Sequence, residues 1–358
     1  MQFPSSHERV LPHQIHLDKP PECQGLEEIE QLNRIQGSLI GLAVGDALGA
    51  SVEFRSHQYL VAHPVQQMQS GGTWGLQAGK WTDDTSMALC LASSLLTQKT
   101  FDPYNQMVRY KWWYKHGYLS STGHCFDIGS ATRQALDEFC QRQKVLMKTL
   151  SLRTENDADQ LSFTDVKNKI DKFDINCSKP GKPGNGALMR LAPVPLFFFR
   201  DPALAVNLSG ESARLTHGDK KAVDACRYYG ALIAAAVRGE SHENLTDESF
   251  YAAHKTRDGY ANGIRGKGYV VDALEAALWA FSKHKGSFKD GVLAAVNLGD
   301  DTDTTAAIYG QLAGAYYGAD HIPPEWLQRL YAKDLIIDIG KWLRYEGDSI
   351  GGKDCQQK

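Results

Sequence analysis

The sequence lacks the features that mark several large classes of protein. Its net charge is −3 and its isoelectric point is near 6.5, so it has no excess of basic residues for nucleic-acid binding. Its mean hydropathy is −0.39. The most apolar run near the start, residues 39–52, contains Asp46 and is shorter than the roughly 20 residues of a membrane span. We therefore expect neither nucleic acid nor a membrane as a partner.

The cysteines do not form the patterns of a disulfide framework or a zinc site. There are seven, an odd number, they are scattered, and none stands in a C-x-x-C pair. The first twenty residues also have no apolar core of the length that a secretory signal needs. Reduced thiols in a cytoplasmic protein are the simplest interpretation.

Strand patterns are missing as well, whereas helical spacing of apolar residues is frequent. It predicts helices over residues 26–35, 85–96, 220–238, 270–283 and 303–317. We predict one large all-α domain over residues 26–347. Residues 1–25 are polar and rich in proline and predict an extended arm outside the core. Residues 140–183 predict a long loop or insertion with some helix, and residues 348–358 a flexible tail.

Glycine is abundant in one particular pattern. Gly37, Gly41, Gly45 and Gly49 recur every four residues and therefore line one face of a helix. A second series, Gly310, Gly314 and Gly318, has the same spacing. Because glycine lowers helix stability, such a face indicates close approach by another backbone. We expect a buried central helix.

Two acidic clusters each precede an apolar helix. The first is Thr82–Asp83–Asp84–Thr85, and the second reads "LGDDTDTTAA" from Leu298 to Ala307. Helix capping is one explanation, because acidic residues are stabilised at helix N-termini. However, adjacent carboxylates repel each other, and a divalent cation held by carboxylate and hydroxyl oxygens would neutralise them. We favour metal binding for the pair of clusters.

The second cluster shares features with two known metal-binding motifs. A calcium loop of the EF-hand type starting at Asp301 needs glycine and glutamate where this chain has Ala306 and Leu312, so it is excluded. Asp301, Asp303 and Thr305 fit the Asp-x-Asp-x-Thr pattern of dehalogenase-type phosphatases. That pattern needs a preceding apolar strand and a large domain after it. A metal-dependent phosphatase is kept as an alternative.

Six motifs in order point to a family. They are "GLAVGDALGASVEF", "GKWTDDTSMAL", "STGHCFDIGSATRQAL", "GNGALMRLAPV", "ARLTH" and "VNLGDDTDTTAAIYGQLAGAYYG". With these, the chain resembles the ADP-ribosylglycohydrolase family over roughly residues 35–345. The resemblance implies an all-α orthogonal bundle with two Mg²⁺ ions, or Mn²⁺, in a central cleft. It also implies hydrolysis of the bond between an acceptor and the distal ribose of ADP-ribose.

The resemblance assigns roles by position. The implied metal ligands are Thr82, Asp83, Asp84, Asp301, Asp303 and Thr304. The implied catalytic residues are Glu53, Asp127 and Asp303, and the implied substrate-binding residues are Gly123, Asp127, Gly129, Gly184, Asn185, Gly186 and His217. Asp300 stands where many relatives have glycine and receives no metal role. Pro183 replaces an aromatic residue of relatives, which puts stacking with adenine in doubt.

From the residues alone, other interpretations stay open. Glu53 also fits a surface carboxylate after a helix, and Asp127 an N-cap of a helix from Ile128. Residues 184–186 fit a plain turn, and His217 a cap before the helix at Asp219.

The segment "TGHCFDIG" is most similar to the arginine-directed branch of the family, so an ADP-ribosylated arginine in a protein is the expected substrate and ADP-ribose the product. Some bacterial relatives are immunity proteins whose N-terminal extension blocks an ADP-ribosyltransferase toxin. Leu11, His13, Ile15 and Leu17 provide points for such a partner here, so a toxin-binding protein is the alternative function. On that hypothesis, deletion of residues 1–25 leaves hydrolysis intact and abolishes toxin binding.

Overall fold

The structure is a computed structural model that describes residues 3–5, 8–170, 173–179, 181, 183–246 and 258–351. In these residues the fold is all-α, with two isolated β-bridges and no strand. The first half contains η1 (Pro12–Gln14), α1 (Leu26–Gly49), α2 (His57–Ala62), α3 (Asp83–Gln98), α4 (Pro103–His116), α5 (Ser130–Thr149), α6 (Glu155–Asp159), α7 (Phe163–Lys169) and α8 (Pro193–Phe197). The second half contains α9 (Pro202–Arg214), α10 (Lys220–Val237), α11 (His242–Leu245), η2 (Tyr260–Asn262), α12 (Val270–Lys283), α13 (Phe288–Val296), α14 (Thr302–Tyr317), η3 (Ala319–His321), α15 (Pro324–Arg329) and α16 (Lys333–Gly351).

The centre of the molecule is an antiparallel pair of helices, α1 and α14. Their glycine faces meet, so that Gly37 lies against Gly314, Gly41 against Gly310, and Gly49 against the backbone of Asp303. A methyl group at Gly45 would lie 2.2 Å from the carbonyl oxygen of Ala306. The backbones therefore touch, as the spacing of the glycines predicts. From Ser38 to Gly49, every residue of α1 is buried.

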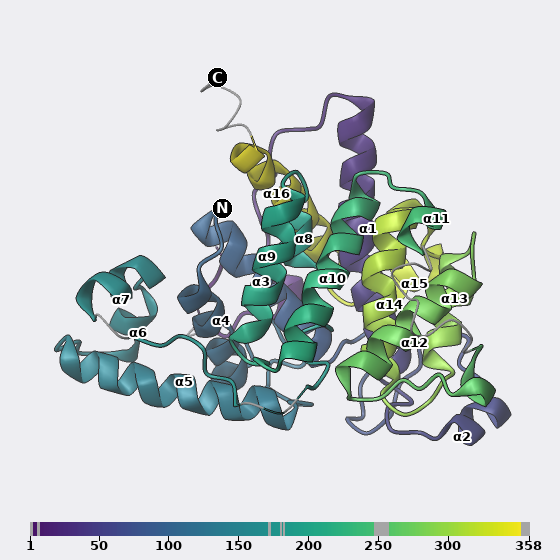
Figure 1. The fold of residues 1–358 in the computed structure, drawn as a ribbon, viewed down its shortest axis with the longest axis horizontal. Coiled ribbons are helices and arrows are strands. Elements are labelled where there is room, and N and C mark those ends of the chain that lie inside the picture. The colour runs from purple at the N-terminus through teal and green to yellow at the C-terminus, as the bar shows by residue number, and fades with distance from the viewer. Residues whose placement is uncertain are drawn as a thin grey trace.

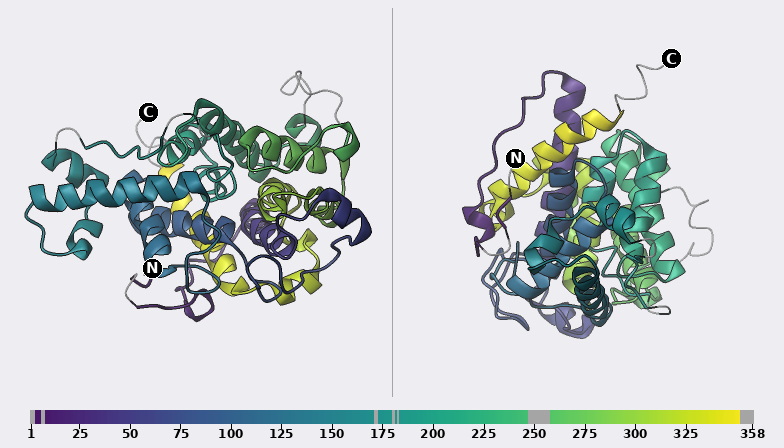
Figure 2. Two further views of the ribbon diagram at one scale, coloured as in Figure 1. Left: turned by 90° about the horizontal axis from the view of Figure 1, so that it is seen from below. Right: turned by 90° about the vertical axis from the view of Figure 1, so that its left-hand side faces the viewer.

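The other helices surround this pair. Helices α3, α10, α12, α13 and α16 pack against α1 or α14, and α4, α8 and α9 form the next layer. Helices α5, α6 and α7 extend to one side of the molecule, as Figure 1 and the left view of Figure 2 show. Within the described ranges, every helix is too short or too polar to span a bilayer. The predicted helices of residues 85–96, 220–238, 270–283 and 303–317 are confirmed.

The predicted insertion is mostly helical at its start. Helix α5 continues through residue 149, and α6 and α7 follow, so residues 140–169 contain more helix than expected. At the other end, α16 continues to Gly351, past the predicted start of the tail at residue 348. Residues 352–358, including Cys355, lie outside the described residues. The other six cysteines are unpaired, as expected.

The N-terminal arm packs on the domain. It is extended apart from η1, but Ile15 and Leu17 are only 8 % exposed and belong to the main hydrophobic core. Nδ1 of His13 lies 2.6 Å from the hydroxyl of Tyr331. The expectation that the arm lies outside the core is therefore wrong at these residues. Because deletion of residues 1–25 would remove core side chains, intact hydrolysis is no longer expected of that truncation.

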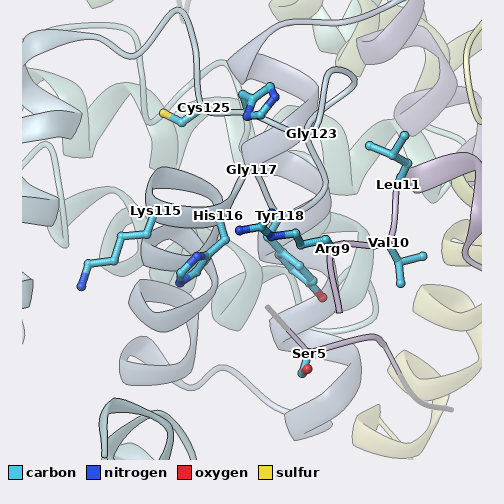
Figure 3. A pocket seen from close by; sticks show the side chains of 11 residues that line it. Ser5, Arg9, Val10, Leu11, Lys115, His116, Gly117, Tyr118, Gly123 and Cys125 are labelled. Carbon is cyan, nitrogen blue, oxygen red and sulfur yellow. The ribbon is translucent and has the colours of Figure 1, made fainter. Parts of the chain in front are cut away.

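The arm also encloses a small hollow, seen in Figure 3. Its volume is about 210 Å³, and it lies between the arm and the loop that follows α4. A methyl group at Gly123 would lie 3.0 Å from Cδ2 of Leu11, so the arm contacts this loop directly. The same loop continues to Asp127, which lies in the cleft described below.

The contact between α1 and α14 gives a first prediction. Changing Gly45 to alanine places a methyl group 2.2 Å from the oxygen of Ala306, so the helices must separate. We expect the free energy of unfolding, measured by urea denaturation, to fall by about 3 kcal/mol or more. The control is Gly25→Ala, because a methyl group there has only a side-chain neighbour, at 3.7 Å. Equal effects of both substitutions would contradict the close contact.

Candidate active site

The two acidic clusters meet at the N-termini of two helices. Asp83 and Asp84 lie in the first turn of α3, and Asp303 and Thr304 in the first turn of α14. The hydroxyl of Thr304 donates to Asp84 Oδ1 over 3.1 Å, and the hydroxyl of Thr82 donates to Asp303 Oδ2 over 3.3 Å. The start of each helix thus provides a threonine hydroxyl that donates a hydrogen bond to an aspartate at the start of the other helix.

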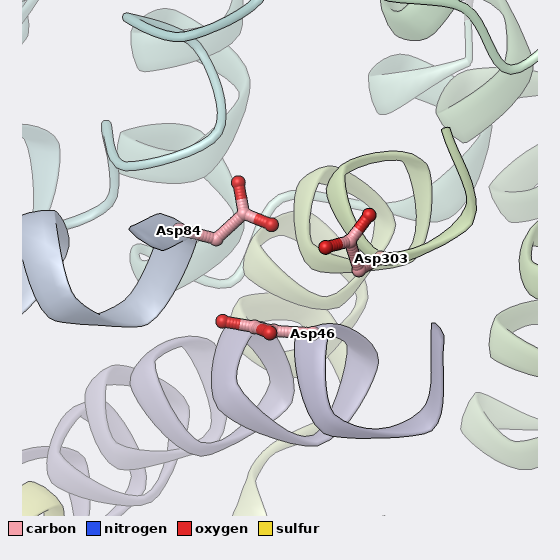
Figure 4. A group of neighbouring side chains, drawn as sticks. All are labelled: Asp46, Asp84 and Asp303. Atoms are coloured by element: carbon pink, nitrogen blue, oxygen red, sulfur yellow. The ribbon is translucent and has the colours of Figure 1, made fainter. Parts of the chain in front are cut away.

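A third helix adds a carboxylate that sequence reasoning missed. Asp46 of α1 is fully buried and lies beside Asp84 and Asp303, so that one oxygen from each falls within 4.8 Å of the others (Figure 4). Its carboxylate accepts hydrogen bonds from the backbone amides of Thr82 and Thr85, at 2.8 and 3.0 Å, and from the Thr85 hydroxyl, at 2.6 Å. The available signal was an aspartate inside an apolar, glycine-lined helix.

Capping does not account for the clusters. The N-cap residues Thr82 and Asp301 make no side-chain capping hydrogen bond of normal geometry. The start of α3 is instead satisfied by Asp46, from outside the helix. The carboxylates of Asp83 and Asp84 are therefore not needed as caps.

A second group of carboxylates lies next to the first. Glu53, Asp127 and Asp303 each place an oxygen within 4.8 Å of the others, so Asp303 belongs to both groups. Glu53 is 5 % exposed and accepts a hydrogen bond from the indole of Trp74 over 3.0 Å, so it is not a surface carboxylate. The interpretation of Asp127 as an N-cap is also wrong, because α5 begins at Ser130 with Gly129 as its N-cap.

Glu53 and Asp127 of the second group line a cleft of about 260 Å³. Of the predicted site residues, ten line it: Glu53, Asp83, Asp127, Gly129, Gly184, Asn185, Gly186, His217, Asp301 and Thr304. Thr82, Asp84 and Asp303 are buried close by. Gly123 does not line the cleft but faces the hollow under the arm. Phe54, Thr132 and Met189 line it without having been predicted.

The segment from Gly184 to Gly186 is more than a plain turn. The side-chain amide of Asn185 donates to Asp301 Oδ2 over 2.7 Å, and its backbone amide donates to the carbonyl of Gly268. A methyl group at Gly186 would lie 2.9 Å from the ring of His217, so glycine is required there. Glycine also lets backbone amides approach an anionic ligand.

His217 is a buried, neutral ring at the edge of the cleft. It is 3 % exposed, and its Nδ1 lies 2.8 Å from the hydroxyl of Thr216. That hydroxyl accepts a hydrogen bond from the Arg190 guanidinium. Burial, with a smaller effect of the Arg190 charge, lowers the pKa of His217 to about 3. The ring is therefore uncharged at neutral pH. It does not cap α10, whose N-cap is Asp219.

Three of the eight non-glycine residues with positive φ in the described chain lie at or beside this cleft. Phe54, Asp127 and Asp300 all have left-handed φ angles, between 60° and 65°. Such angles are uncommon for residues other than glycine and cost about 1–3 kcal/mol each. Asp300 thus occupies a glycine-like conformation. Its backbone hydrogen bonds with Phe54 and Arg55 join the loop before α14 to the loop after α1.

The carboxylates raise one another's pKa. Burial, followed by repulsion from Asp127 and Asp301, raises the pKa of Glu53 to about 9. Burial raises the pKa of Asp127 to about 7, and it holds the pKa of Asp303 well above its usual range. In the described part of the chain no ion pair offsets these charges; the buried pair Lys111–Asp159 lies elsewhere.

The phosphatase alternative fails on local structure. The residues before Asp301 form α13, which ends at Val296, and a short loop. The strand that this pattern requires is therefore replaced by a helix.

The raised pKa values predict how stability depends on pH in the presence of a chelator. The unfolded carboxyls titrate near pH 4 and the folded ones higher, so the folded state binds more protons between these values. The stability that these groups contribute is therefore fully present below about pH 4 and is lost as the pH rises to about 9, so we expect the thermal midpoint to fall over this range. An unchanged or rising midpoint would contradict the buried, uncompensated carboxylates.

The hydrogen bonds of Asp46 give a third prediction. Alanine at this position leaves two buried amides and a hydroxyl without their acceptor. We expect a loss of about 2–4 kcal/mol in unfolding free energy by urea denaturation. Asp219→Ala, which removes one ordinary cap of α10, should cost about 1 kcal/mol and serves as the control. Equal losses would show that Asp46 has no special structural role.

Comparison with known proteins agrees with this geometry. Residues 27–350 match the family model of ADP-ribosylglycohydrolase. The chain is 33 % identical to ADP-ribosylarginine hydrolase Tri1 of Serratia proteamaculans, over 96 % of this chain and 87 % of that protein. It is 30 % identical to the ADP-ribosyl-[dinitrogen reductase] glycohydrolase of Rhodospirillum rubrum, over 84 % of this chain and 91 % of that protein.

A solved structure agrees as well. The ADP-ribosylglycohydrolase-related protein complex contains a chain that is 36 % identical and superposes with a TM-score of 0.68, covering 89 % of this chain and 99 % of that chain. The order of the motifs, the all-α fold and the buried carboxylates at two helix starts thus have one explanation: the chain belongs to the ADP-ribosylglycohydrolase family.

Proposed function

We propose that this member of the family is a metal-dependent hydrolase that removes ADP-ribose from arginine residues of proteins. The arginine linkage is supported by the Tri1 relatives, which are named ADP-ribosylarginine hydrolases. The one from Pseudomonas putida is 36 % identical over 88 % of this chain and 78 % of that protein. The observation that carries the proposal is the paired set of buried carboxylates at the starts of α3 and α14.

The residues present fit a pair of hard cations. Oδ1 of Asp303 and Oδ2 of Asp127 are buried and have no hydrogen-bond partner. Asp303 belongs to both carboxylate groups, so it would be available to hold a cation. The proposed ligands are Thr82, Asp83, Asp84, Asp301, Asp303 and Thr304. Two Mg²⁺ ions, or Mn²⁺, would neutralise these charges, hold ribose hydroxyls and supply a positioned water.

The chain's own residues would divide the remaining work. Cleavage of a glycosidic bond passes through a state with positive charge on the ribose, which the nearby carboxylates stabilise. Glu53 and Asp127 are the carboxyls available for proton transfer, and the Trp74 indole fixes one oxygen of Glu53. Asn185 orients Asp301, and neutral His217 packs beneath the glycine segment that faces the ligand.

Toxin binding stays a prediction. Ile15 and Leu17, two of the points expected to meet a partner, are occupied by the domain itself. A partner would instead meet an arm already in place, at exposed residues such as Arg9 and His16.

The test of the proposed function is release of ADP-ribose from an arginine-ADP-ribosylated protein, with and without Mg²⁺, beside a serine-linked substrate. We expect Mg²⁺-dependent release from arginine. Asp303→Asn should lower kcat about 100-fold or more, and its unfolding midpoint in chelator should be unchanged or higher because one buried charge is removed. Full activity in Asp303→Asn would refute the metal assignment, and release from serine alone would refute the arginine linkage.

A further inference from the structure

Two large aromatic side chains are exposed beside the cleft, although only four aromatic side chains are exposed among the described residues. Phe54 is 64 % exposed and Trp74 is 41 % exposed. Phe54 follows Glu53 and lines the cleft, and Trp74 hydrogen-bonds Glu53. The Trp74 ring lies 5.7 Å from that of Phe126, the neighbour of Asp127. These three rings, which we call the aromatic rim, therefore border the carboxylates.

The fold alone gives no reason for phenylalanine at position 54. Its φ angle is 65°, which glycine or asparagine adopts more easily than an aromatic residue. Two backbone hydrogen bonds hold the loop in this conformation. The Phe54 amide donates to the Asp300 carbonyl, and the Asp300 amide donates to the Arg55 carbonyl. Since most of the side chain lies in solvent, little burial offsets the strain. A strained and exposed residue at a cleft points to a ligand outside the fold.

The size of the cleft indicates which part of a substrate reaches the rim. At about 260 Å³, the cleft is small even for a small-molecule site, so a polypeptide must stay outside it. Aromatic side chains give large contact areas at low entropic cost and are enriched where proteins meet.

We propose that the aromatic rim contacts the acceptor protein around its modified residue, with Phe54 as the residue that favours protein substrates over small ones. The proposal rests on the proposed hydrolysis of ADP-ribosylarginine. It assigns to Phe54 recognition of the polypeptide and leaves the carboxylates below to act on the ribose.

The test uses Phe54→Asn in the full chain, with two substrates: an arginine-ADP-ribosylated protein and free ADP-ribosylarginine. Asparagine suits the left-handed backbone, so the thermal midpoint should stay the same or rise. We expect kcat/KM for the protein to fall about tenfold, the effect of losing one aromatic anchor. The fall for free ADP-ribosylarginine should be smaller, so that the ratio of kcat/KM for the protein to kcat/KM for the free compound decreases.

Val145→Asn is the matched control. Val145 is 63 % exposed on α5 and does not line the cleft, so this variant should match the unchanged chain on both substrates. Equal losses on both substrates in Phe54→Asn would overturn the proposal, because Phe54 would then act on the part that they share. No loss on the protein would also overturn it. If the unchanged chain cleaves neither substrate, the proposed hydrolysis itself fails.

Discussion

The close contact of α1 with α14 is the constraint on which the site depends. Glycines on both helices let the backbones touch, and the touching ends bring Asp46 of α1 next to Asp303 of α14. Helix α3 is fixed to the same place because Asp46 accepts hydrogen bonds from its first turn. Three chain segments far apart in sequence thus converge on one set of carboxylates, and a methyl group at Gly45 would separate two of them.

The same arrangement places stability and activity in opposition. Buried carboxylates without cationic partners favour their protonated forms, which raises their pKa and weakens the folded state at neutral pH. A large, well-packed core around α1 and α14 offsets this cost. Binding of hard cations would remove it. Active sites are often less stable than the fold could make them, since the charges that act on a substrate are kept close together.

Strain and exposure divide the cleft into two parts. The floor contains carboxylates held by helix starts and hydrogen bonds, whereas the mouth contains loops with left-handed residues and exposed aromatic rings. The N-terminal arm adds a further contact, because Leu11 packs on the loop that leads to Asp127. This loop is therefore supported by the arm on one side and faces the cleft on the other. Loops on a rigid scaffold are where specificity commonly lies.

The sequence by itself determined the helical class, the central glycine faces and the two Asp/Thr clusters, because helical spacing and local charge are visible along the chain. Resemblance extended this to Glu53, Asn185 and His217, which line or border the cleft. Only the tertiary structure decided that Asp46 joins the carboxylates, that Gly123 faces the arm, that Asp127 is no cap, and that Ile15 and Leu17 are core residues. Apart from the start of α5, each of these depends on contacts between segments distant in sequence, and a local pattern of residue types contains no information on which segments meet.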